Sequence, residues 1–278
     1  MSHTHTTGGK FKPFSASFFV CIVTISSIIY LCALWYLTPS VWNIQIRAGV
    51  RNVVITTLAF HLGYAFFEFF FHRYVFHMSL IPGLSWLHTA HAHHHALTNI
   101  VFRKTGVINY FAIEQPEQHE NSFFPWYSFL AFALVLTLPF VGLQWLLPQA
   151  PIFLGGIIAL MISISLYEFL HALEHQPNEL WDKRLTHPNF LIRMVWRRVY
   201  TFHLRHHANK TCNEGVGGFL GFRIADWFFG TAVYPRTIYP HGTFVPRLEF
   251  TPPKPCAFIA WLDEYAMKIC QARREKTM

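Results

Sequence analysis

Histidines dominate the residues of this chain that could do chemistry. The 278-residue sequence contains 18 of them, and four short groups read HRYVFH, HAHHH, HALEH and HLRHH in chain order. Imidazole nitrogens bind Fe, Cu and Zn alike, and burying so many imidazoles together without a metal would leave donors and acceptors unpaired. The sequence therefore predicts metal binding by ten histidines, which are His72, His77, His91, His94, His95, His171, His175, His203, His206 and His207.

The spacing within the groups suits ligation from helices. Residues three and four apart share one helical face; two groups contain H-x-x-H-H, and a third has its histidines four apart. His72 and His77 are five apart, which separates them by about 140° on an ideal helix. They converge on one metal only if the helix loosens there, and otherwise they serve two different metals. We expect the second arrangement, with about five nitrogens and one open position for each of two octahedral ions.

Two acidic residues stand close to the predicted ligands. Glu68 is four residues before His72, and Glu168 is three residues before His171, so each lies on the ligand face of its helix. Either carboxylate can accept the free N–H of a ligating imidazole. Glu68 and Glu168 are therefore candidate catalytic residues that would act by orienting the ligands. Glu168 and His171 also match the Glu-x-x-His pair of soluble di-iron bundles, so direct ligation by Glu168 stays open. The alternative for both is an interfacial acid paired with an arginine.

The remaining histidines receive weaker assignments. His61 stands alone inside an apolar stretch and is expected to be a satisfied buried group. His88 precedes the second histidine group and His93 stands within it, and both are expected to lie around the metals rather than on them. No role is assigned to His119, His187 and His241, which lack helical partners.

The chain that must position these groups has the composition of a membrane protein. It is 53% hydrophobic and only 13% charged, too few charged residues to cover a soluble surface. Four apolar stretches reach the roughly 20 residues that span a bilayer; they cover residues 14–37, 53–71, 123–147 and 151–170. We expect an all-α integral membrane fold, with four transmembrane helices capped by a helical region that holds the dimetal site.

The expected domain organisation is simple. A polar tail occupies residues 1–13, and residues 14–278 form a single membrane domain. Its histidine-rich parts are residues 72–122 and 171–278, so every histidine group lies at or beyond the same end of the spans.

Basic residues predict the orientation. Of the 22 Lys and Arg, only Arg47 and Arg51 fall on the side opposite both termini, and the positive side is cytosolic. Active site and termini are then cytosolic, at an inner membrane or the endoplasmic reticulum. The net charge of +8 is expected to hold the cap against anionic headgroups, not to bind nucleic acid. The five cysteines contain no C-x-x-C pair, so thiols are not expected as ligands.

Taken in order and interleaved with four spans, the histidine groups resemble those of the fatty acid hydroxylase/sterol desaturase superfamily of membrane di-iron oxygenases. The stretch GVGGFLGFRIADWFFGT is similar to the glycine-aromatic segment that follows the last histidine group in that family. The resemblance covers roughly residues 50–235 and implies the same ten ligands. It implies two Fe ions, with Zn possible in purified protein, and O2. It also implies electrons from NAD(P)H through a separate cytochrome b5 or ferredoxin-like donor, because the chain has no HPGG haem motif.

The setting and the resemblance together predict a monooxygenase that hydroxylates an unactivated C–H bond of a lipid, either a fatty acyl chain or a sterol-like substrate. Two metals facing an apolar cavity suit O2 chemistry away from water, and four residues between His72 and His77 favour the acyl branch. Desaturation by the same site is the alternative, although the 14 residues from His77 to His91 are fewer than in acyl-CoA desaturases, whose third box begins with Asn instead of His171. A metal transporter would need ligands near the bilayer midplane, where only His61 stands.

Overall fold

The structure is a computed structural model that describes residues 15–277. Four of its helices are long and apolar enough to cross a membrane. They confirm the predicted membrane class and begin and end within a few residues of the predicted spans. The predicted polar tail, residues 1–13, lies outside the described residues. The four spans are α1 (Ala16–Leu37), α3 (Gly49–Phe71), α6 (Ser128–Leu146) and α7 (Ile152–Glu174).

The central span is α7, which packs against α1, α3 and α6. Small residues allow the close approach, as is usual between helices in a membrane. A Cβ atom at Gly155 would lie 2.7 Å from the Thr56 side chain, and one at Gly156 would lie 2.5 Å from the Phe140 ring. The Tyr64 hydroxyl of α3 donates to the Gly156 carbonyl at 3.2 Å. These contacts fix α3 and α7 side by side, which brings their histidine-bearing ends together.

The connections follow from local sequence. Short helix α2 (Pro39–Arg47) begins with a proline, which needs no N–H partner at a helix start, and turns the chain from α1 to α3. The last two spans form a tight helical hairpin, since only Leu147–Pro151 separate α6 from α7. Ser15 caps α1 by accepting from the Phe18 N–H.

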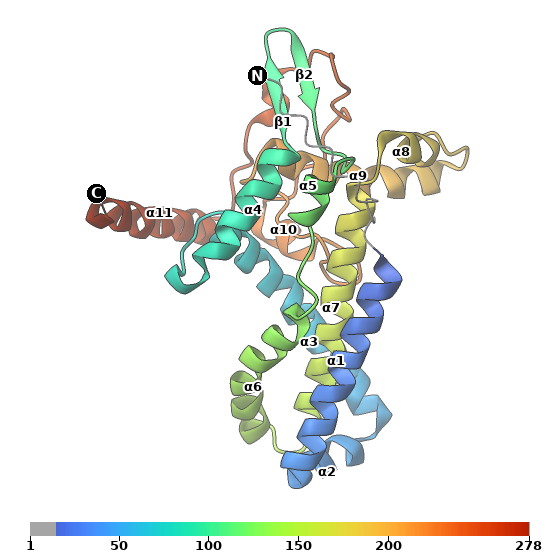
Figure 1. Cartoon of the computed structure of the whole chain (residues 1–278), viewed down its shortest axis with the longest axis vertical. Coiled ribbons are helices and arrows are strands. Elements are labelled where there is room, and N and C mark those ends of the chain that lie inside the picture. Colours follow the sequence, from blue (N-terminus) through green and yellow to red (C-terminus); the bar gives the residue numbers. More distant parts are fainter. Residues whose placement is uncertain (1–14, 278) are drawn as a thin grey trace.

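The remaining elements gather at one end of the spans and are called the cap (Figure 1). Helix α11 leaves the cap nearly crosswise to the spans (Figure 1). The cap contains the π-helix η1 (His72–Phe76), the 3-10 turns η2 (Pro82–Leu84) and η3 (Arg247–Phe250), and the helices α4 (Ser85–Leu97), α5 (Pro116–Glu120), α8 (Asn178–Leu185), α9 (Phe190–Ala208), α10 (Ile224–Phe229) and α11 (Ala257–Thr277).

The cap also contains a β-hairpin, so the all-α prediction is wrong in this detail although the chain is mostly helical. Strand β1 (Ile100–Arg103) pairs antiparallel with β2 (Gly106–Asn109), with Ile100 opposite Asn109. β-branched and aromatic residues on both sides of a glycine-containing turn are the signal that the prediction missed. Gly106 has φ +116°, and a Cβ there would lie 2.7 Å from the Gly242 carbonyl oxygen, so glycine is required.

Candidate dimetal centre

The ten predicted ligands come together as two groups of five, each of which can hold a metal ion. Within each group, one ligand atom per residue lies within 4.8 Å of all the others. Site A consists of His72, His77, His91, His95 and His206. Site B consists of His94, His171, His175, His203 and His207.

Two cap helices divide their histidines between the sites. On α4, His91 and His95 belong to site A and share a helical face, whereas His94, about 100° from His95 and about 60° from His91 around the helix, belongs to site B. On α9 the division is reversed, because only His206 belongs to site A. The end of α3 completes site A and the end of α7 completes site B, so each site combines one span with both cap helices.

A π-helix brings His72 and His77 into the same site. The expectation that these two residues serve different metals is therefore wrong, and the alternative of a loosened helix is what occurs. Residues His72–Phe76 form a π-helix, whose backbone bonds join residues five apart, and the His77 N–H accordingly donates to the His72 carbonyl at 3.1 Å. The two imidazoles stack with their ring centroids 4.9 Å apart.

The spacing of the Nε2 atoms indicates the coordination geometry. In site A the Nε2 atom of His91 lies 2.9 Å from that of His72 and 3.1 Å from that of His95. In site B the Nε2 atoms of His175 and His203 are 3.1 Å apart. Two nitrogens at about 2.1 Å from one ion are about 3.0 Å apart when their bonds meet at 90°, but about 3.4 Å apart at a tetrahedral angle. The observed spacing favours octahedral angles, in which five nitrogens leave one position open.

Backbone carbonyls fix the tautomer of several ligands. The Nδ1–H of His175 donates to the Phe111 carbonyl at 2.6 Å, and that of His206 donates to the Cys212 carbonyl at 2.8 Å. His72 and His207 donate in the same way, to the carbonyls of Glu214 and Thr98. A proton on Nδ1 leaves a lone pair on Nε2, so the Nε2 atoms of these four histidines are in the form that can bind a cation.

Burial keeps these imidazoles neutral. It lowers the pKa of His175 to about 4, and burial together with neighbouring histidines lowers the pKa of His94 and His203 well below the usual range. The Nε2 atoms of His94 and His171 are buried and have no hydrogen-bond partner among the described residues. Neutral imidazoles with unshared lone pairs are the form that binds a metal, so the residues present fit two ions.

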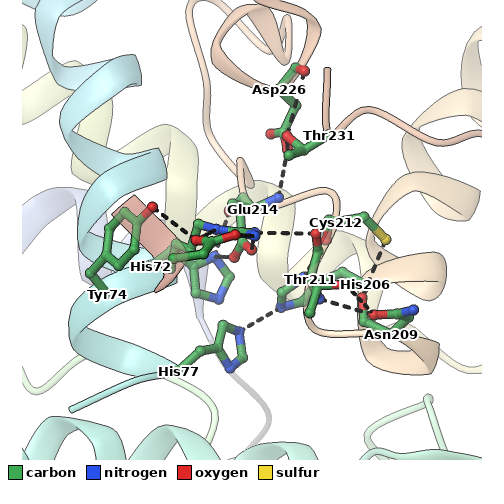
Figure 2. A network of polar contacts seen from close by, with 12 residues as sticks. His72, Tyr74, His77, His206, Asn209, Thr211, Cys212, Glu214, Asp226 and Thr231 are labelled. Atoms are coloured by element: carbon green, nitrogen blue, oxygen red, sulfur yellow. Dashed lines mark hydrogen bonds and ion pairs between the residues drawn. The ribbon is translucent and has the colours of Figure 1, made fainter. Parts of the chain in front are cut away.

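Glu214, which the sequence interpretation missed, supports site A. Its carbonyl accepts the Nδ1–H of His72, and its carboxylate oxygen Oε2 lies 4.0 Å from the same nitrogen. Arg73 neutralises this buried carboxylate at 2.7 Å and also binds Asp263 of α11 at 2.6 Å. Figure 2 shows His72 and Glu214 close together, with His77 and His206 of the same site beside them. The signal in the sequence was Arg73, directly after His72, because a buried arginine needs a carboxylate partner.

Glu174 plays the corresponding part at site B. Its Oε2 lies 4.0 Å from Nδ1 of His203, and its Oε1 accepts from Arg223 at 2.7 Å. Both residues of this ion pair are buried. Glu174 stands inside the HALEH group itself, next to His175, but helical spacing alone did not distinguish it from Glu168. Each metal site is thus backed by one buried arginine–glutamate pair.

The two predicted acidic residues have other partners. Glu68 accepts the backbone N–H groups of Val216, Gly217 and Gly218. Glu168 accepts the N–H of Phe124 at 2.9 Å through Oε1, while its buried Oε2 has no hydrogen-bond partner among the described residues. No hydrogen bond joins either carboxylate to an imidazole in the described part of the chain.

The other histidines between residues 15 and 277 lie outside both sites. His88 donates from Nδ1 to the carbonyl of Phe76 at 2.6 Å, just behind the π-helix. His93 is half-exposed and lies 3.7 Å from Glu117. His61 is buried in α3 and contacts Ser163 at 2.7 Å. None of His119, His187 and His241 belongs to either group.

Two cavities reach the sites from different directions. The span cavity lies between α3, α6 and α7, is lined mainly by apolar side chains such as Phe132, Leu136 and Leu160, and ends at His72. The cap cavity is lined by His91, His94 and His171, so ligands of both sites face it.

Three aromatic residues separate the cavities. Phe76, Phe124 and Tyr167 line both of them. The Phe124 ring centroid lies 6.2 Å from that of Phe76 and 5.2 Å from that of Tyr167. These rings therefore stand between the span cavity, which itself reaches His72, and the cap cavity with its three histidines.

No model of a known protein family matches the chain, and neither does any curated protein or solved structure. Two neighbouring ions with open positions, next to an apolar cavity, can act on a substrate that lies away from water.

Removing one ligand should remove metal. We expect wild-type protein to bind two ions per chain, and His175→Ala and His206→Ala each to bind about one or fewer, because four remaining nitrogens hold an ion less well than five. Metal analysis of the purified protein by mass spectrometry measures this directly. His241→Ala, outside both sites, is the matched control, and equal metal content in all variants would contradict the assignment.

The carboxylate behind site A should tune metal affinity. Glu214→Gln removes the negative charge near His72 and leaves Arg73 partly unpaired, so we expect 10- to 100-fold weaker binding of one of the two ions, the range typical of groups that orient ligands. Competition with a chelator gives the affinity. Glu117→Gln, at an exposed carboxylate beside His93, should leave both affinities unchanged; a similar loss in the two variants would argue against a specific role.

Proposed function

We propose that this chain is a membrane di-iron monooxygenase that hydroxylates an unactivated C–H bond of a lipid. The observation that carries the proposal is an apolar cavity between membrane-spanning helices that reaches His72 of site A, where α4 and α9 join site A to the second five-histidine site. An all-nitrogen, five-ligand site with octahedral angles suits iron better than tetrahedral zinc. The resemblance of the ordered histidine groups to lipid-hydroxylating oxygenases points the same way.

The reaction requires that R–H, O2, two electrons and two protons give R–OH and water. When bound, the two iron ions would supply the activation of O2. The chain's own residues would hold the substrate and exclude water, since Phe132, Leu136 and Leu160 offer no hydrogen-bonding groups to solvent. The rings of Phe76 and Phe124 would place the reacting carbon near the ligands.

The partners follow from the same arrangement. A lipid can enter the span cavity sideways from the bilayer, where Phe67 stands partly exposed at its edge. The electrons would come from a separate protein that meets the cap, with NAD(P)H as the source. The distribution of Lys and Arg favours a cytosolic cap, at an inner membrane or the endoplasmic reticulum.

Metal transport is disfavoured by the environment of His61. This residue is the only histidine inside the described spans away from the cap. Its two ring nitrogens already contact Ser163 at 2.7 Å and the N–H of Leu220 at 3.0 Å. A transport path through the spans would need ligands near the midplane that are available to an ion.

Lipid analysis under ¹⁸O2 tests the function. We expect cells that produce the protein to contain a lipid with one ¹⁸O atom, and cells that produce His206→Ala to lack it, because site A is then incomplete. Mass spectrometry of extracted lipids measures the label, and His241→Ala serves as the active control. A product that has lost two hydrogens without gaining oxygen would show desaturation, and no change in any lipid would refute the proposal.

Filling the span cavity should block the reaction without disturbing the metals. Leu136→Trp places a larger side chain in the cavity, and we expect at least about a 10-fold loss of product, since one misplaced group can cost 100-fold in rate. Leu138→Trp on the exposed face of the same helix is the control and should retain activity. Product formation and metal content are measured together; unchanged product from Leu136→Trp would place the substrate elsewhere.

A further inference from the structure

The segment after site A runs back along a membrane-spanning helix. It covers residues 216–229 and is called the re-entrant segment. The Leu220 N–H donates to Nε2 of His61 at 3.0 Å. His61 stands eleven residues before His72 on the same helical run, which is about 16 Å along the axis. The tip of the segment therefore lies beside the interior of α3, well below the level of the metal ligands.

The backbone groups of this segment are satisfied within the protein. Glu68 accepts three consecutive N–H groups, those of Val216, Gly217 and Gly218. Phe219 and Phe222 exchange two backbone hydrogen bonds, at 3.0 and 2.9 Å. Irregular backbone is tolerated at membrane depth only where its polar groups have such internal partners. This requirement accounts for a carboxylate and an imidazole inside α3 that the metal sites do not use.

The side chains show a polarity opposite to that of a water-facing surface. The exposed residues are all apolar, with exposed fractions of 53% for Leu220, 59% for Phe222, 50% for Trp227 and 72% for Phe228. The charged residues Arg223 and Asp226 are buried, the first against Glu174 and the second against the N–H groups of residues 214 and 215. Large exposed apolar patches mark contact with a membrane or a partner.

The patch is continuous with the spans below it and with α11 beside it. The Phe228 ring centroid lies 5.7 Å from that of Phe66 in α3, so the patch continues the lipid-facing surface of that helix. On α11, the ring centroid of Phe258 lies 6.4 Å from that of Phe229, and Trp261, which follows, is 58% exposed. Tryptophan is enriched at the boundary between lipid and water. In Figure 1, α10 lies beside the cap end of the spans, and α11 runs crosswise to them.

We propose that residues 216–229 are inserted in the bilayer as a re-entrant element, with lipid hydrocarbon as the partner of its four exposed apolar side chains, and that α11 lies at the membrane surface. The charge pattern and the continuity with α3 favour lipid over a second protein surface. The proposal does not depend on the reaction. It has a structural consequence for site A, because Glu214, which accepts from His72, stands two residues before the inserted element and is set at a defined depth by it.

Nitroxide accessibility in lipid vesicles tests the insertion. The full chain, with its five cysteines replaced, receives single cysteines at Leu220 or Phe228 and is reconstituted in phosphatidylcholine. We expect both labels to collide with O2 several-fold more than with a water-soluble nickel chelate, as at Leu138→Cys on the exposed face of α6. Phe244→Cys, at an exposed cap position, should show the reverse. Metal content equal to that of the wild type shows that each variant is folded.

The outcomes are distinct. Preferential collision with the nickel chelate at Leu220 and Phe228 would mean that water covers the patch, and low collision with both reagents would mean that protein covers it, for example a second copy; either result overturns the proposal. The unmodified chain gives an independent measurement. A phospholipid with a photoreactive acyl chain should label peptides containing residues 219–229 but not residues 240–246, and the opposite pattern would also overturn it.

Discussion

The close approach of buried imidazole nitrogens is the constraint on which the rest of the structure depends. The Nε2 atoms stand 2.9 to 3.1 Å apart, close enough to share one cation, and burial keeps the rings uncharged. The surrounding chain therefore holds each ring from behind. Carbonyls of Phe111 and Cys212 fix the tautomer of two ligands, and a π-helix turns His77 toward His72. Sites A and B therefore depend on tertiary structure, because no single helix can form either of them.

Buried ion pairs connect these sites to the outer parts of the fold. Arg73 lies next to His72 and binds both Glu214 and Asp263, so α11 at the end of the chain is joined to the first metal ligand. Arg223 joins the re-entrant segment to Glu174 at the end of α7. Such pairs contribute little net stability, because burial costs about as much as the attraction gives, but they select one arrangement over others. Here they select the arrangement in which both sites are complete.

The local features of this fold could be predicted from sequence, and the non-local ones could not. Apolar length defines the four spans, and three- and four-residue spacing identifies the histidines of α4 and α9 that come together, because both signals lie within one helix. The expectation that His72 and His77 serve different metals assumed the spacing of an α-helix. The π-helix at His72 changes that spacing, so the expectation was wrong. Glu214 and Glu68 acquire their roles only from partners far away in the chain. The hairpin at Ile100 was missed because its strands are short and follow a helix.

The π-helix also joins site A to the two cavities. Phe76 lies between the two ligands of this turn, its ring stacks on His91 with centroids 4.7 Å apart, and it lines both cavities. The backbone geometry that turns His77 into site A therefore also sets where the Phe76 ring stands. A change that restored an α-helical turn would displace a ligand and the separating ring at once. Because π-turns cost stability and occur mostly at functional sites, this double role is a physical reason for the chain to keep one here.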